Sequence, residues 1–211
     1  MKIYVMGIWS SIYGISLGLI TYIGGIILDF TIDNVTRLKM IEEEPELYNE
    51  LYKSTFVNLL VISPLYFMIS ELYMVNNGMY YIGEVVIIVL MHNLFYYMAH
   101  YTMHNNNSMK NIHIYHHFYK RNIIPSVANA VSVNEMLYAY LTPFQITALL
   151  IKPELYSFII GVSIISFMNL IIHSTHLCNY KWVKGLVSPM QHNRHHNLYT
   201  EHYSAPVFDI G

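Results

Sequence analysis

Charged residues are scarce in this 211-residue chain: only 11% are Asp, Glu, Lys or Arg, whereas 55% are hydrophobic. A soluble globular domain carries about 25% charged residues, so the chain lacks the charge needed to cover a surface that faces water. The net charge of −2 is not the positive excess of a nucleic-acid-binding domain, and we expect no nucleic acid among its partners. The single cysteine, Cys178, excludes an internal disulfide and a cysteine-based zinc site.

Long apolar runs account for the missing charge. A helix needs about 20 mostly apolar residues to cross the hydrocarbon core of a bilayer. Three runs are long enough by themselves, and two shorter runs are separated by a Lys-Pro-Glu sequence that we interpret as a hairpin turn. In chain order the runs cover residues 3–28, 56–75, 79–99, 136–151 and 155–172. The sequence therefore predicts an all-α integral membrane protein with about four to five transmembrane or membrane-embedded helices.

The polar stretches between these runs indicate an orientation. If every run crosses the membrane, residues 29–55, 100–135 and 173–211 share one side, and each stretch holds three of the eleven Lys and Arg residues. Loops on the cytosolic side are enriched in Lys and Arg, so we expect this side to be cytosolic. The acidic residues at 42–50 are interpreted as a solvated amphipathic connector.

Histidine is the residue in excess, with 12 copies against 11 Lys and Arg together. Ten of them form four clusters, all at or just beyond the predicted cytosolic ends of spans: His100 and His104; His113, His116 and His117; His173 and His176; His192, His195 and His196. Residues three and four apart share one face of a helix, so each H-x-x-H-H triplet is expected to direct three imidazoles at one volume. Neutral imidazole is a good ligand for iron, zinc, copper and nickel. Ten imidazoles exceed the needs of one metal, and two metals with about five nitrogens each would use them all.

Two histidines lie outside the clusters. His92 is inside the third run, where we interpret it as a structural hydrogen-bonding residue or as a neighbour of the ligands. His202 follows the last cluster by six residues and is not expected to be a ligand. A membrane metal transporter should carry ionisable ligands within its spans. Only Glu84, His92 and Asn93 are that deep, which counts against transport.

The histidine motifs and their surroundings resemble the fatty acid hydroxylase superfamily, particularly its sterol desaturase and sterol methyl oxidase branch. The resemblance begins near residue 79 and extends to the C-terminus. Its segments are residues 93–104, similar to D-x-x-x-Y-W-x-H-R-x-x-H; residues 113–117 with Pro125, similar to H-K-x-H-H…P; residues 188–196, similar to T-P-x-x-H-x-x-H-H; and residues 203–211, similar to N-Y-G…W-D…F-G. The chain is accordingly divided into N-terminal anchor helices with the acidic connector, at residues 1–78, and a catalytic domain at residues 79–211.

The resemblance implies an integral membrane oxidoreductase with two iron ions, or zinc after purification. Members use dioxygen to hydroxylate, demethylate or desaturate lipids such as sterols or fatty acyl chains in lipid biosynthesis. Their electrons come from NAD(P)H through a reductase and a b-type cytochrome, and in eukaryotes they reside in the endoplasmic reticulum. Carried over, the resemblance makes all ten clustered histidines metal ligands. The residues expected around them are Asn93, Tyr97, Asn134 and His92.

Four positions depart from the family pattern. Asn93 replaces the usual Asp, Tyr101 the usual Arg and Met98 the usual Trp, and Asn134 stands where many members have His. The Asp would orient a ligand histidine through a hydrogen bond; Asn93 keeps an acceptor for this bond but loses the charge. A member that binds metal without turnover, or a membrane metal-handling protein, is therefore the alternative to a working enzyme.

Overall fold

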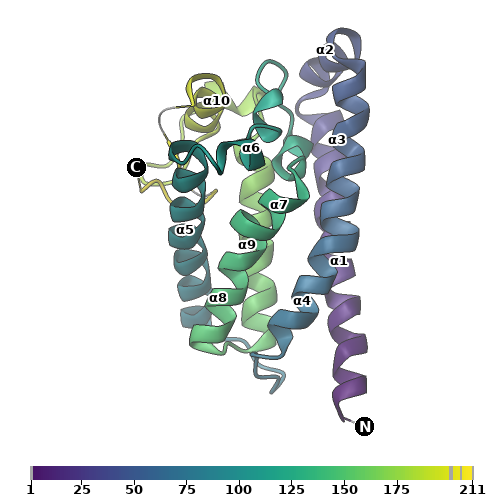
Figure 1. The fold of residues 1–211 in the computed structure, drawn as a ribbon, viewed down its shortest axis with the longest axis vertical. Coiled ribbons are helices and arrows are strands. Elements are labelled where there is room, and N and C mark those ends of the chain that lie inside the picture. The colour runs from purple at the N-terminus through teal and green to yellow at the C-terminus, as the bar shows by residue number, and fades with distance from the viewer. Residues whose placement is uncertain (1, 200–201, 205, 211) are drawn as a thin grey trace.

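Four helical segments are long and apolar enough to cross a membrane, and they form the body of the molecule (Figure 1). The computed structural model describes residues 2–199, 202–204 and 206–210, with side chains from residue 11 onward. Within them the candidate spans are residues 11–31 in α1 (Lys2–Thr31), 45–71 through α3 (Pro45–Val57), η1 (Asn58–Ile62) and α4 (Ser63–Glu71), 82–105 in α5 (Ile82–Asn105), and 155–172 in α9 (Leu155–Ile172). The predicted all-α membrane fold is confirmed, because the described residues contain only isolated β-bridges and no sheet.

The expected runs differ in their limits from the helices, most of all the second and the fourth. The second helical span begins at Pro45, not at residue 56, and ends at Glu71. Proline suits the first turn of a helix, where its missing N–H would have no partner, so α3 starts inside the stretch expected to be a connector. The residues before α3 form α2 (Asn34–Glu43), whose Met40 is fully buried. The run at 136–151 forms the π-helix η4 (Met136–Leu141) and α8 (Thr142–Ile151), and is not among the candidate spans.

The two π-helices have the same local cause. Each ends at a Ser-Pro or Thr-Pro sequence, where the proline ring would clash with the carbonyl four residues before it. The chain avoids the clash by widening the helix, so that the Ser63 and Thr142 backbone N–H groups donate to the carbonyls five residues back. Their hydroxyls donate to the same carbonyls, those of Asn58 and Leu137, at 2.7 Å. Such bulges are frequent at functional sites.

A buried irregular loop runs through the bundle between the helices. Residues 122–131, which include η3 (Pro125–Asn129), are buried, and buried backbone groups need hydrogen-bond partners. Polar side chains of the surrounding helices provide them. Asn58 donates to the carbonyls of Asn129 and Val131 at 3.0 and 2.9 Å, Asn169 donates to the Ala128 carbonyl at 3.1 Å, and Asp29 accepts from the Ser126 N–H at 3.0 Å. This explains why the apolar helices carry these polar residues.

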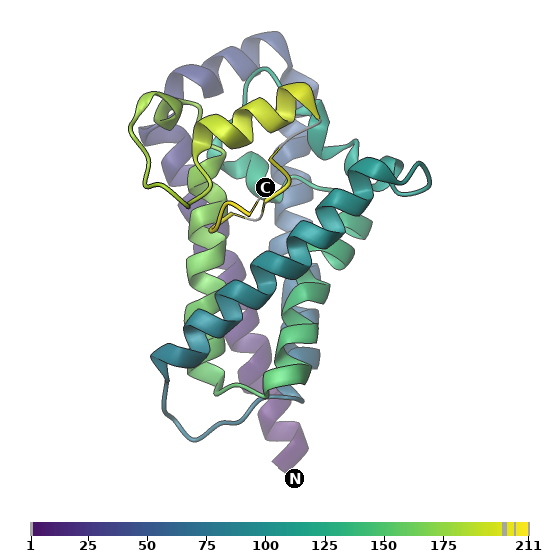
Figure 2. The ribbon, with the colours of Figure 1, turned by 90° about the vertical axis from the view of Figure 1, so that its left-hand side faces the viewer.

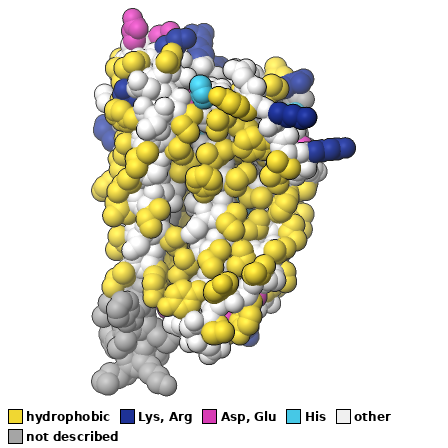
Figure 3. All heavy atoms as spheres, turned by 180° about the vertical axis from the view of Figure 1, so that it is seen from behind, with side chains coloured by type: hydrophobic (Ala, Val, Ile, Leu, Met, Phe, Trp, Pro, Cys, Tyr) yellow, Lys and Arg dark blue, Asp and Glu magenta, His cyan; other side chains and the backbone are white. Residues whose placement is uncertain are grey.

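The histidine clusters lie at one end of the bundle. Short elements cover this end: α6 (Lys110–His113), η2 (His116–Phe118), α7 (Val133–Glu135), η5 (His176–Asn179) and α10 (Pro189–Leu198). α5 crosses the bundle at a steep tilt, and α10 lies across the end of the bundle that carries the histidine clusters (Figure 2). On the face shown in Figure 3, hydrophobic side chains cover the middle of the molecule, and most of the visible Lys and Arg side chains lie toward the upper end.

Candidate metal centre

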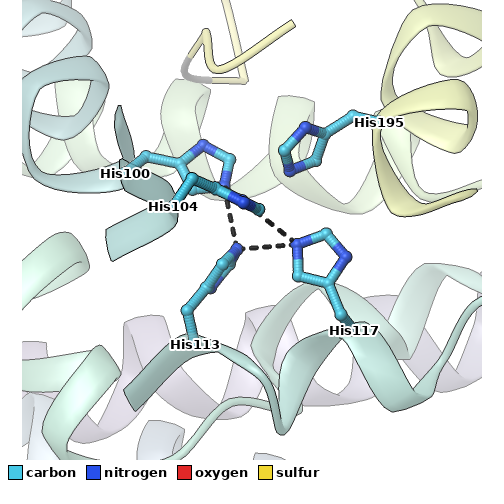
Figure 4. Close-up of side chains that lie close together, drawn as sticks. All are labelled: His100, His104, His113, His117 and His195. Atoms are coloured by element: carbon cyan, nitrogen blue, oxygen red, sulfur yellow. Dashed lines mark hydrogen bonds between the residues drawn. The ribbon is translucent and has the colours of Figure 1, made fainter. Parts of the chain in front are cut away.

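The structure brings nine of the ten predicted ligands into two adjoining groups. In each group, one ligand atom per residue lies within 4.8 Å of the others. The larger group, which we call site A, contains His100, His104, His113, His117 and His195; its five rings point toward one another (Figure 4). The smaller group, site B, contains His116, His173, His192 and His196. The rings of His117 and His196 are 4.9 Å apart between centroids, so the two sites are neighbours.

Each H-x-x-H-H triplet contributes to both sites, contrary to the expectation that it serves one volume. In α10, His192 and His196 belong to site B, whereas His195 belongs to site A. The reason is helical geometry: residues i and i+4 are about 40° apart around the helix axis, whereas i+3 and i+4 are about 100° apart. The i, i+4 pair converges on one site, and the i+3 ring diverges toward the other. The sequence predicts two metals with about five nitrogens each, whereas the structure groups five histidines in site A and four in site B.

Local contacts position the helices that carry these residues. Ser188 and Gln191 form a reciprocal capping box at the start of α10, with Pro189 in its first turn. The Gln191 amide donates to Asp209 at 2.6 Å, which connects α10 to the C-terminal segment. These contacts set the direction from which α10 presents its three histidines.

Hydrogen bonds at the outer ring nitrogens orient the ligands. Nδ1 of His100, His116 and His173 faces the backbone carbonyls of Tyr203, Ala130 and Asn169, at 3.0, 3.4 and 2.7 Å. A carbonyl oxygen can only accept, so each of these Nδ1 atoms carries the proton. Nε2 of each ring therefore presents a lone pair to the centre of its site, as a metal-ligating histidine does.

The inner nitrogens have the spacing of a ligand set. Consecutive Nε2 atoms of His100, His104, His113 and His117 in site A are 2.8–3.3 Å apart, and those of site B are 2.8–3.4 Å apart. Metal–nitrogen bonds of about 2.0–2.1 Å would separate neighbouring ligands by about 3 Å. His116 and His173 face each other at 3.4 Å with both Nε2 atoms deprotonated, so these atoms repel each other unless a cation lies between them. The residues present therefore fit a metal in each site.

Burial keeps these imidazoles neutral. Desolvation lowers the pKa of His113, His116, His192 and His196 well below the ordinary value of 6.5, and neighbouring histidines lower it further. Burial also lowers the pKa of His173, to about 4. Metal binding requires neutral imidazole, so at neutral pH the sites are already in the protonation state that a metal needs.

A buried carboxylate that the sequence analysis missed supports site A. Glu135 is fully buried, and its Oε1 lies 2.6 Å from Nδ1 of His113. Burial raises the pKa of the Glu135 carboxyl well above its ordinary value, and the positive charge of a metal bound at His113 would favour the ionised form. A carboxylate in this position orients a ligand histidine and increases its basicity. The available signal was a charged residue directly before the apolar run at 136–151. The predicted neighbour, Asn134, is exposed at the preceding position.

Asn93 has a different role from the one expected. Its side chain donates to the Phe208 carbonyl at 2.9 Å and accepts from the Phe208 N–H at 3.0 Å. It therefore fixes the C-terminal segment to α5, and the same segment provides the Tyr203 carbonyl that orients His100. Asn93 acts on a ligand through the backbone, and an amide can make both bonds where a carboxylate cannot, because only the amide both donates and accepts.

The remaining predicted neighbours are placed as follows. The Tyr97 ring packs against Tyr101, at 6.2 Å between centroids, and it is Tyr96 that lies beside a ligand, 5.3 Å from the His100 ring. His92 is buried one helical turn below Tyr96, and its Nε2 is 3.3 Å from the Tyr140 carbonyl.

His176 and His202 belong to neither group of described residues. α9 ends at Ile172, and the chain then turns into η5, which directs the His176 ring toward Tyr180. The buried Asp33 holds this turn, because it accepts from the Ser174 and Thr175 hydroxyls and from the His176 N–H. The tenth predicted ligand is thus separated from His173 by the end of the helix.

Comparison with protein-family models matches residues 85–210, more than half of the chain, to the model described as "Fatty acid hydroxylase". The match includes every histidine of sites A and B. Comparison with curated proteins and with solved structures found no match. The division into an anchor at residues 1–78 and a catalytic domain at residues 79–211 stays a prediction.

Proposed function

The chain belongs to the fatty acid hydroxylase family, and from this premise we propose that it is a membrane-bound di-iron oxidoreductase that uses dioxygen to hydroxylate, demethylate or desaturate a lipid. The family indicates a lipid hydroxylase-type oxidoreductase, and the four apolar helices make it a membrane protein. One observation carries the finer proposal: nine converging imidazoles form two adjoining groups with the nitrogen spacing of two metal sites.

The residues of site A and site B would hold one iron each. Imidazole suits iron as well as zinc, so zinc can occupy the same sites after purification. Bound iron would supply the oxidising chemistry, by activating dioxygen toward an unactivated C–H bond. The protein's own part is to hold the neutral imidazoles in place, through the carbonyl partners of His100, His116 and His173 and the carboxylate of Glu135.

A lipid substrate is supported by a cavity among the membrane helices. The cavity has a volume of about 80 Å³ and is lined by residues of α1, α4, α5, η4, α8 and α9. Its walls are mostly apolar, as small-molecule sites usually are, and Tyr96 connects them to the His100 ring. A lipid would enter this space from the bilayer.

The electron donor is proposed to dock on the face that carries the histidine sites. Lys120 and Arg121 follow η2, and Lys181 and Lys184 follow η5; all four are exposed. A basic face of this kind attracts an acidic partner, such as a b-type cytochrome that receives electrons from an NAD(P)H reductase. The excess of Lys and Arg on this side supports a cytosolic orientation, in the endoplasmic reticulum if the source is eukaryotic.

Metal analysis combined with lipid profiling tests the proposal. Protein purified in detergent should contain about two equivalents of iron plus zinc by mass spectrometry, and the double variant His116→Ala, His195→Ala should lose metal from both sites. Cells that express the wild-type protein under ¹⁸O₂ should contain a labelled lipid, or a lipid with a new double bond, that is absent with the double variant. His202→Ala, outside both sites, is the matched control.

The alternatives predict different results. An intact protein without metal would overturn the metal sites. Metal binding with an unchanged lipid profile would point to a family member without turnover. An unchanged profile together with altered cellular metal content would point to a metal-handling protein.

A further inference from the structure

Two of the polar side chains that line the cavity among the membrane helices have a buried nitrogen without a hydrogen-bond partner among the described residues. These are the side chains of His92 and Asn129, which are only 1% and 5% exposed. We propose that the cavity binds the hydroxyl group of a lipid alcohol, with His92 accepting its proton in a hydrogen bond and Asn129 donating to its oxygen. This inference rests on the proposed function and names the substrate class: a lipid that already carries an alcohol.

The hydrogen bonds of His92 determine what it can offer. Its Nε2 lies 3.3 Å from the carbonyl oxygen of Tyr140, which can only accept, so Nε2 carries the ring proton. Nδ1 is then an acceptor with a free lone pair. It is buried and has no hydrogen-bond partner among the described residues, so it is available to accept a hydrogen bond from a ligand in the cavity.

Asn129 offers the complementary group. Its side-chain Nδ2 is buried and also has no partner within the described part of the chain. An amide NH₂ is a donor only. The backbone of Asn129 is fixed, because its carbonyl accepts from Asn58 at 3.0 Å. The side chain is therefore held at the cavity wall with a donor that lacks an acceptor.

A hydroxyl group has the chemistry that both atoms require, since its oxygen accepts and its proton donates. An ether or a ketone would leave Nδ1 of His92 unpaired, and a hydrocarbon would leave both atoms unpaired, which is costly in a buried site. A carboxylate or phosphate is disfavoured because no Lys or Arg is among the described lining residues. Ionisable side chains at membrane depth usually mark a functional site.

The cavity is large enough for more than a water molecule. Its volume of about 80 Å³ exceeds several-fold the 10–15 Å³ that one water needs. Apart from the polar pair, much of the wall is apolar, including Leu17, Phe144, Phe158 and Ile165. A hydroxyl with an attached hydrocarbon body therefore fits the lining better than water alone.

The polar pair is also close to the metal centre. The Tyr96 ring is 6.1 Å from the His92 ring and 5.3 Å from the His100 ring, between centroids. Along α5, His92 precedes His100 by eight residues, which is about 12 Å. A lipid held by its hydroxyl at His92 would be positioned with part of its body below site A.

Ligand competition tests this inference without requiring turnover. The protein, purified in detergent with its metals, is incubated with tritiated 1-hexadecanol, and unlabelled 1-hexadecanol, cholesterol and 1-methoxyhexadecane compete for the site. The methyl ether keeps an acceptor for Asn129 but cannot donate to His92. At least one of the two alcohols should compete about tenfold better than the ether. The alcohol that competes better distinguishes a chain alcohol from a sterol.

Variants link the preference to the two side chains. His92→Phe and Asn129→Leu should each reduce the preference for alcohol over ether to about twofold or less. Thr21→Val is the matched control: Thr21 lines the same cavity, but its hydroxyl already donates to the Leu17 carbonyl at 2.9 Å, so the preference should be kept. If one variant does not fold, the alcohol-over-ether preference of the other variant, compared with that of the wild-type protein, still tests the inference.

The outcomes separate this inference from the proposed function. Equal competition by alcohols and ether, no specific binding of either alcohol, or a preference that survives in His92→Phe would overturn the inference; the cavity would then hold water or a hydrocarbon. Alcohol binding with the expected preference, in a protein that oxidises no lipid, would keep the inference while the proposed function fails.

Discussion

The contact between Glu135 and His113 makes a quantitative prediction about site A. Glu135→Leu removes the carboxylate that lies 2.6 Å from Nδ1 of His113 and keeps a side chain of similar volume. A hydrogen bond to a charged group contributes about 1.5–3 kcal/mol. Each 1.4 kcal/mol corresponds to a tenfold change in affinity. We therefore expect metal binding at site A to weaken about 10- to 100-fold, the range found for partners of ligand histidines.

Site B should be spared, because none of its four histidines hydrogen-bonds to Glu135 within the described residues. A chelator titration followed by metal analysis should remove one metal from Glu135→Leu at concentrations where the wild-type protein keeps two. Asn134→Leu, an exposed position one residue earlier, should behave like the wild type. Two metals that leave together, at the wild-type chelator concentration, would refute the reasoning.

Three further predictions concern the ligands, the C-terminal segment and pH. His196→Ala should lower the metal content from about two equivalents to one, because it removes a ligand of site B only; retention of both metals would contradict the assignment. Asn93→Leu breaks both hydrogen bonds to Phe208 and should lower the thermal unfolding temperature in detergent by several degrees, since buried unpaired groups cost about 1–3 kcal/mol each. The metal-free protein should be most stable above pH 6.5 and lose stability toward pH 4. Burial lowers the pKa of His173 to about 4, so the unfolded chain binds more protons in that range; this histidine alone accounts for about 3 kcal/mol. Denaturation measured between pH 4 and 8 shows whether the stability falls as the pH falls. Greater stability at pH 5 than at pH 7 would contradict the prediction.

Much of the architecture could be predicted from composition and spacing. A membrane helix must be apolar along its whole length, since the bilayer offers its side chains no water, so the spans are visible as runs in the sequence. Their limits were less accurate where proline decides the start of a helix, as at Pro45. The clustered histidines were also visible, because i, i+3 and i+4 spacing is a local property that survives in the folded chain.

The division of the ligands between two sites depended on the tertiary structure. Whether His195 joins His192 or His100 depends on how α10 is oriented over the bundle, and no local pattern contains that orientation. The same holds for Asn93, which resembled a ligand-orienting residue in sequence but pairs with the backbone of Phe208, 115 residues away.

The sequence by itself determined the class of the protein, because apolar length and histidine spacing act within single helices. Only the tertiary structure decided which imidazoles share a site, which carboxylate supports them, and which polar side chains satisfy the buried loop at residues 122–131. It also brought His92 and Asn129 to one cavity. These are contacts between residues far apart in the chain, and their energies depend on burial and distance, which become defined when the helices pack together.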